Sequence, residues 1–155
     1  MSKFLLKLLL GFSLCSVQAS YADTILVITR RDSGVEQLTV RELKAIFRRK
    51  ILVNEQGLRW IPLNLNADHP LRRAFSQRVF EQQPEDMETY WNEQYFQGVM
   101  PPYVVASEEA VLRFVISMPN AIGYIRPCYL DTRVQVVMTL RISGALAGGN
   151  CPSSP

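Results

Sequence analysis

Residues 107–125, SEEAVLRFVISMPNAIGYI, contain the signals of a helix, a stop and a strand in one uninterrupted stretch. Ser107 is a favoured N-cap residue for the helix. The apolar residues that follow recur at the i, i+3, i+4, i+7 spacing of a buried helical face: Val111, Phe114, Val115 and Met118. Pro119-Asn120 ends this helix, and the apolar run from Ala121 to Ile125 predicts a strand directly after it.

The same alternation of predicted helices and strands is found in the residues before Ser107. Ile25 to Thr29 is a β-branched and apolar run that predicts a buried strand. Thr39 and Glu42 match a capping box and therefore predict a helix start. The residues expected on its buried face are Val40, Leu43, Ile46 and Phe47. Arg59 to Leu65 is again extended, with Pro62 expected at a sheet edge or a strand end.

Two more helices and one more strand complete the pattern. Asp68-His69-Pro70 predicts a helix start, since proline is well placed in a first turn, and another helix is expected near Pro84. The aromatic residues of that later helix are interpreted as core: Trp91, Tyr95 and Phe96. Val134 to Met138 predicts the last strand. Alternating strands and helices indicate an α/β protein with a mixed sheet flanked by helices.

The N-terminus has the order of a secretory signal peptide. Lys3 and Lys7 precede an apolar run from Leu8 to Val17, and small residues lead to a cleavage site after Ala22. The run is shorter than the roughly 20 residues that a membrane-spanning helix needs. Residues 1–22 are therefore predicted to be removed, which leaves residues 23–155 as one domain, periplasmic or secreted and without membrane insertion.

Charge and cysteine content limit the partners of that domain. Two of the 17 basic residues, Lys3 and Lys7, lie in the leader, which leaves 15 against 14 acidic residues and no field that would attract nucleic acid. Cys15 is discarded with the leader, so Cys128 and Cys151 are predicted to form a disulfide in an oxidising compartment. One histidine and two distant cysteines do not make a metal site, and no cofactor is expected.

Several short motifs occur in the order seen in small phosphate ABC transporter substrate-binding-like proteins. They are Leu38-Thr39 through Phe47, Trp60-Ile61-Pro62, Arg73-Ala74-Phe75, Tyr90-Trp91, Phe96-Gln97-Gly98, Pro101-Pro102 and Pro119-Asn120-Ala121-Ile122-Gly123-Tyr124. The chain thus resembles a member of the periplasmic-binding-protein-like superfamily, over about Ile25 to Val137. The resemblance implies a single lobe of type II for residues 23–155.

The resemblance also implies that an oxyanion is captured at helix N-termini. The residues that would contribute are Asn66, Asp68, His69, Arg72, Arg73 and Ser107. Asp68 is more simply an N-cap, and Arg72 and Arg73 are expected in solvent unless they form a fork to an anion. Phosphate binders of this kind carry Ser-Gly-Thr where this chain has His69-Pro70-Leu71, so phosphate is predicted to bind more weakly than about 10 μM.

No catalytic residues are assigned. His69 is the only histidine, and no nucleophile and base can be paired with it, so the chain is predicted not to be an enzyme. Two functions remain open. One is a module that binds a small anion or another solute, alone or for a membrane transporter. The other is a periplasmic sensory or protein-interaction accessory that keeps the fold with a degenerate ligand site, with a sensor as its partner.

Overall fold

The computed structural model describes residues 24–142. The predicted signal peptide with its cleavage site and Cys151 of the predicted Cys128–Cys151 bridge lie outside this range. Five strands form one sheet: β1 Thr24–Arg30, β2 Ile61–Leu65, β3 Tyr103–Val105, β4 Ala121–Ile125 and β5 Val134–Arg141. All four strands predicted from the sequence are present, and the short β3 is an addition.

The sheet is mixed, as predicted. Its strand order is β3-β2-β4-β1-β5. β2 runs parallel to both β3 and β4, whereas β1 pairs antiparallel with β4 and with β5. β2 is an inner strand, but Pro62 lies near its start, one residue before the pairing with β3 begins at Leu63. The strand-end alternative for Pro62 is therefore the correct one, because its missing N–H lies outside that ladder.

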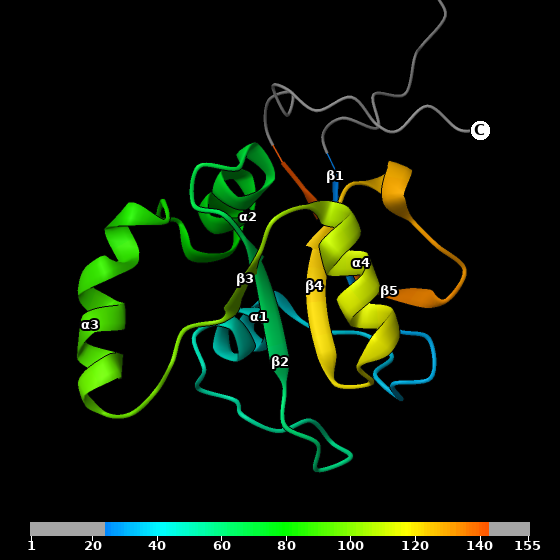
Figure 1. Ribbon diagram of the computed structural model, residues 1–155, viewed down its shortest axis with the longest axis horizontal. Helices are drawn as coiled ribbons and strands as arrows, with labels where there is room; N and C mark the ends of the chain where they lie inside the picture. The colour runs from blue at the N-terminus through cyan, green and yellow to red at the C-terminus, as the bar shows by residue number, and fades with distance from the viewer. Residues whose placement is uncertain (1–23, 143–155) are drawn as a thin grey trace, which may run out of the picture.

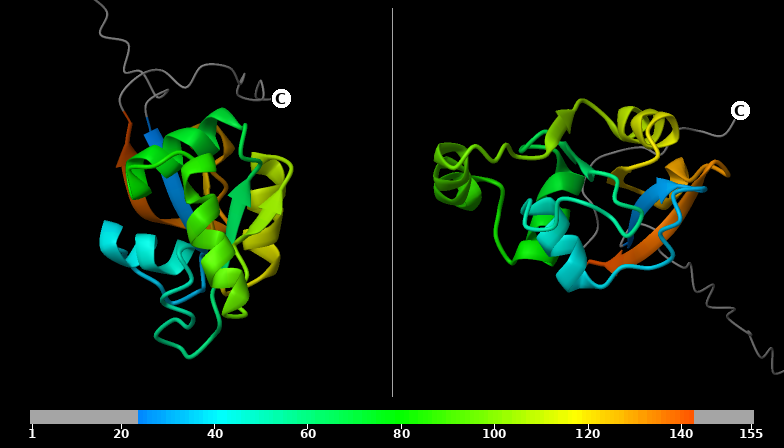
Figure 2. Two further views of the ribbon diagram at one scale, coloured as in Figure 1. Left: turned by 90° about the vertical axis from the view of Figure 1, so that its left-hand side faces the viewer. Right: turned by 90° about the horizontal axis from the view of Figure 1, so that it is seen from below.

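Helices cover both faces of the sheet. The helical elements are α1 Val40–Phe47, α2 Pro70–Phe80, the 3₁₀ turn η2 Glu85–Met87, α3 Glu88–Phe96, α4 Glu108–Ser117 and the 3₁₀ turn η3 Pro127–Tyr129. α4 lies on one face, and α1 and α2 lie on the other (Figures 1 and 2). α3 stands apart from the sheet on the side of β3 (Figure 1). Within residues 24–142, no helix is long and apolar enough to cross a membrane.

The core shows why β4 carries Gly123 and Tyr124 side by side. Neighbouring residues of a strand face opposite sides of the sheet. Tyr124 faces α1 and α2, where its ring stacks on Phe75 with centroids 3.9 Å apart and lies 6.1 Å from Phe47. Gly123 faces α4, and a Cβ placed on it would lie only 2.4 Å from Val111 Cγ1. The missing side chain therefore lets α4 approach the sheet closely.

Five residues predicted to be buried are exposed in the structure. Val40, Phe114 and Met118 are 38, 43 and 37% exposed, and Tyr95 and Phe96 are 63 and 89% exposed. In α1 and α4 the buried stripe is narrower than the periodicity suggested, because only the centre of each stripe packs into the hydrophobic core. Tyr95 and Phe96 lie at the end of α3, where no element of the described chain covers them.

Candidate functional site

The polar residues that were predicted as candidate site residues lie at one edge of the sheet. The carboxyl ends of β2, β3 and β4 meet there, since these strands are parallel. α2 begins shortly after β2, and α4 begins shortly after β3. Both helices thus start at the edge that lies uppermost in Figure 1, where open α/β sheets commonly bind ligands.

Arg72, in the first turn of α2, is only 7% exposed. Its Nη1 donates a hydrogen bond to Oδ1 of Asn64 on β2. The hydroxyl of Tyr124 on β4 lies 3.3 Å from the same oxygen and accepts from the Leu65 N–H at 3.2 Å. We call Asn64, Arg72 and Tyr124 the Arg72 cluster. It joins β2, β4 and α2 beneath the edge.

The Arg72 cluster holds a positive charge without a carboxylate. Among residues 24–142, the ion pairs formed by arginines involve other residues, and the bond that is seen from Arg72 goes to the neutral Asn64 amide. Burial raises the pKa of the Tyr124 phenol, and the nearby Arg72 charge acts in the opposite direction. Tyr124 therefore stays neutral at physiological pH. A buried guanidinium that lacks an acidic partner favours an anion from outside the chain.

Arg73 points elsewhere. It forms a bidentate pair with Glu85 of η2, with nitrogen–oxygen distances of 3.0 and 2.9 Å. The expectation that both arginines lie in solvent is therefore wrong for Arg72 and right for Arg73. The two neighbours differ because the first turn of α2 packs one side on β2 and turns the other toward η2.

The start of α2 is capped by a residue other than the one expected. His69 is the N-cap, and its Nδ1 accepts from the Leu71 N–H at 3.2 Å. Asp68, the expected cap, is exposed, and so is Asn66. The backbone explains the shift, because Pro70 occupies the first helical position and the donor within reach is the Leu71 N–H. Asn66, Asp68 and His69 thus form the loop above the Arg72 cluster.

The start of α4 already contains a negative charge. Ser107 Oγ accepts from the Ala110 N–H at 3.2 Å, which confirms it as the N-cap. The next residue, Glu108, is 2% exposed and accepts from the backbone N–H and Nε of Arg126, both at 2.7 Å. Its carboxylate occupies the position where the helix dipole favours an anion. Of the two helix starts, that of α2 is the one left for an external anion.

Other parts of the described chain fit an anion less well. A cavity of about 590 Å³ lies near the opposite edge of the sheet, between the loops around Val35 and Asn54. Its lining includes Glu36, Glu42 and Glu55 and no lysine or arginine. Residues 24–142 contain no group of three metal-ligating side chains that would hold a metal ion. The Arg72 cluster is therefore a better candidate for an anion site than this cavity.

Comparisons with known proteins identify the fold. No protein-family model and no curated protein matches the sequence. Among solved structures, a phosphate ABC transporter substrate-binding protein with bound phosphate from Clostridium perfringens shares 23% identity, with a TM-score of 0.62 over 74% of this chain and 44% of that chain. An ABC-type phosphate transport receptor from Vibrio cholerae shares 16% identity, with a TM-score of 0.60 over 74% of this chain and 45% of that one.

PstS from Borrelia burgdorferi is similar in the same way, at 17% identity and a TM-score of 0.54, covering 69% of this chain and 42% of that one. The match spans less than half the length of each of these three proteins. The fold expected from the sequence motifs, an α/β lobe of the periplasmic-binding-protein-like type, is thereby confirmed.

Proposed function

We propose that this chain, which has the fold of one lobe of the phosphate-type substrate-binding proteins, is an exported, non-catalytic module that binds a small oxyanion at the start of α2. The observation that carries the proposal is the burial of Arg72 at the ligand edge without a carboxylate partner. Maintaining an unneutralised charge there is costly unless an anion compensates it. A membrane transporter or a sensor is the proposed receiver of the loaded module.

The same geometry predicts modest affinity for phosphate itself. Pro70 removes one backbone donor from the start of α2, and Leu71 provides no hydroxyl. Each missing hydrogen bond to a charged ligand weakens binding by about 1.5–3 kcal/mol. We therefore expect a Kd for inorganic phosphate weaker than about 10 μM, or less favourable than about −6.8 kcal/mol.

The adjacent arginines supply a matched pair of variants. Isothermal titration of the exported protein with phosphate at low ionic strength should show one saturable site. Arg72→Gln should weaken it by at least about tenfold, because a charge-assisted bond is lost. Arg73→Gln should leave it nearly unchanged, since that side chain is engaged with Glu85 outside the site.

Two controls separate binding from folding. The thermal melt of each variant reports whether the fold survives, and Arg72→Lys keeps the charge while it removes the planar fork. Sulfate and a short carboxylate are titrated in parallel to define the class of anion. The proposal is rejected if none of the three anions binds, or if Arg72→Gln and Arg73→Gln weaken binding equally.

A further inference from the structure

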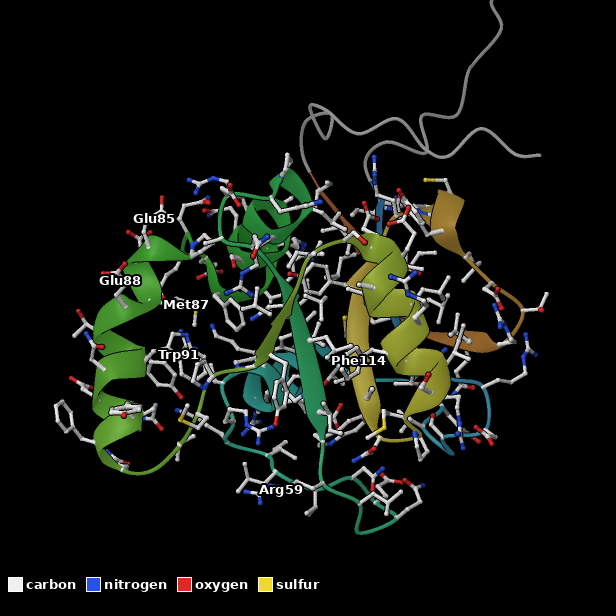
Figure 3. The ribbon with its side chains drawn as sticks, viewed as in Figure 1. Arg59, Glu85, Met87, Glu88, Trp91 and Phe114 are labelled. Carbon is white, nitrogen blue, oxygen red and sulfur yellow. The ribbon has the colours of Figure 1, made fainter. Side chains whose placement is uncertain are left out.

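α3 receives little cover from the other residues that the structure describes. None of its residues is buried. Its inner face rests on the core through Tyr90 and Trp91, which are half-buried, and Figure 3 shows Trp91 pointing toward the sheet. The rest of the helix projects from the molecule in Figure 1 and in the right-hand view of Figure 2. A helix of nine residues is marginal in water unless it packs against something.

The end of α3 and the segment after it present an apolar surface. Its large side chains are between 60 and 89% exposed: Tyr95, Phe96, Met100, Tyr103 and Val104. We call these five residues the α3–β3 patch. At such exposure the three aromatic rings alone offer roughly 400 Å², about half of what one partner contributes to a standard protein interface. Patches of this size commonly mark contact sites.

β3 adds an open edge to the patch. It lies at the end of the strand order and pairs only with β2 within the described residues. Natural sheets protect such edges with charged side chains. This one has none, since residues 95–107, YFQGVMPPYVVAS, contain no charged residue. The edge of β3 is therefore unprotected, and the residues next to it in the chain are largely apolar and uncharged.

Opposite charges flank the α3–β3 patch at its two ends. Figure 3 places Glu88 near the upper end of α3 and Arg59 at the bottom of the molecule, below β2. Both side chains are exposed, and neither forms an ion pair with a described residue. Arg49 lies at the same end as Arg59, because its Nη1 donates a hydrogen bond to the Trp60 carbonyl at 2.9 Å.

We propose that two copies of this chain associate through the α3–β3 patch, with the two β3 edges antiparallel about a two-fold axis. A two-fold axis brings each surface against its own copy, so a charged centre would repel itself, whereas this centre is uncharged. The axis also reverses the two ends, which places Glu88 of each copy toward Arg59 of the other. The apolar centre and the crossed charges are both self-complementary.

The oligomeric state of the full exported protein tests this proposal. Sedimentation velocity over roughly 1–100 μM should show a monomer–dimer equilibrium. Val104→Lys adds a charge to the edge strand and should weaken the dimer by at least about tenfold. Phe114→Lys is the matched control, because Phe114 is also exposed but lies on α4, away from the patch (Figure 3). It should leave the dimer unchanged.

Charge reversal tests the orientation independently of folding. Glu88→Arg should weaken the dimer by placing it against Arg59 of the second copy, and Arg59→Glu should do the same. The double variant restores the crossed attraction and should recover dimerisation. A protein that stays monomeric up to about 100 μM overturns the proposal. So does a dimer that responds equally to Val104→Lys and Phe114→Lys, or one that the double variant fails to restore.

Discussion

Gly123 is the residue at which a single methyl group would disturb the packing of a helix on the sheet. Because a Cβ here would lie 2.4 Å from Val111 Cγ1, Gly123→Ala forces α4 away from β4. We expect the free energy of unfolding to fall by about 1–3 kcal/mol, as overpacked cores generally show. Urea unfolding of the variant measures this change.

A double-mutant cycle identifies the cause. Val111→Ala alone should destabilise the protein, since Val111 is fully buried. In the double variant the smaller side chain at 111 makes room for the methyl group at 123, so the loss should be less than the sum of the two single losses. Strict additivity would show that Gly123 is needed for a reason other than the approach of Val111.

Asp131 provides the clearest pH dependence in the structure. It accepts hydrogen bonds from Arg133 Nε and the Arg133 backbone N–H at 2.9 and 2.8 Å, and these bonds lower the pKa of the Asp131 carboxyl to about 2. The folded pKa lies below the unfolded value of 3.8, so this stabilisation is present above about pH 4 and is lost as the pH falls toward 2.

The contribution should be well under 1 kcal/mol, because the pair lies at the surface. Carboxyl titration followed by NMR measures the pKa directly, and Arg133→Gln should return it toward 3.8. An Asp131 carboxyl that titrates near 3.8 in the unaltered protein would contradict the prediction.

Arg72 shows which part of the site lay beyond prediction. The sequence predicted the start of α2, because Asp68-His69-Pro70 is a helix-start signal. Arg72 follows Pro70 by two residues and was therefore expected in the first turn. Burial of the arginine depends on Asn64 from β2 and Tyr124 from β4, and the latter is distant in the chain. Local patterns do not encode such contacts. The same applies to Glu108, whose partner Arg126 lies on the far side of α4 and β4 in the sequence.

Among the elements, α1 is the one whose start is most sharply defined. Thr39 Oγ1 accepts from the Glu42 N–H at 3.2 Å, and the Thr39 N–H donates to Glu42 Oε2 at 2.7 Å, which confirms the predicted capping box. Thr39→Ala should lower the free energy of unfolding by about 1 kcal/mol. Chemical denaturation tests this, with Thr132→Ala, an exposed threonine outside any helix, as the matched control.

α3 and β3 mark the limit of prediction at this scale. The strands β1, β2, β4 and β5 and the helices α1, α2 and α4 follow from hydrophobic periodicity and capping signals. For α3 the helix was predicted correctly, but its end was assigned to the core. An aromatic residue contributes the same signal whether the surface that covers it belongs to its own chain or to another. Tyr95 and Phe96 therefore could not be placed from the sequence.

For the molecule as a whole, we predict a bridge between Cys128 and Cys151, which would tie the segment around Cys151 to η3. Thiol titration of the unreduced, denatured exported protein should detect no free thiol. Reduction should lower the stability by about 3 kcal/mol if the native bridge is unstrained, since it closes a loop of ordinary length. Two free thiols in protein recovered from an oxidising compartment would contradict the bridge.

The position of β1 determines when the molecule can fold. β1 pairs with β4 on one side and with β5 on the other. Leu26 therefore has no strand partner until Ile125 and Thr139 have been synthesised. Within residues 24–142, the first strand in the sequence is therefore completed by the last two. Such non-local pairing forms slowly. The chain therefore stays open for most of its synthesis, and under the export that we propose it could pass through a secretion channel in this open state before the sheet closes.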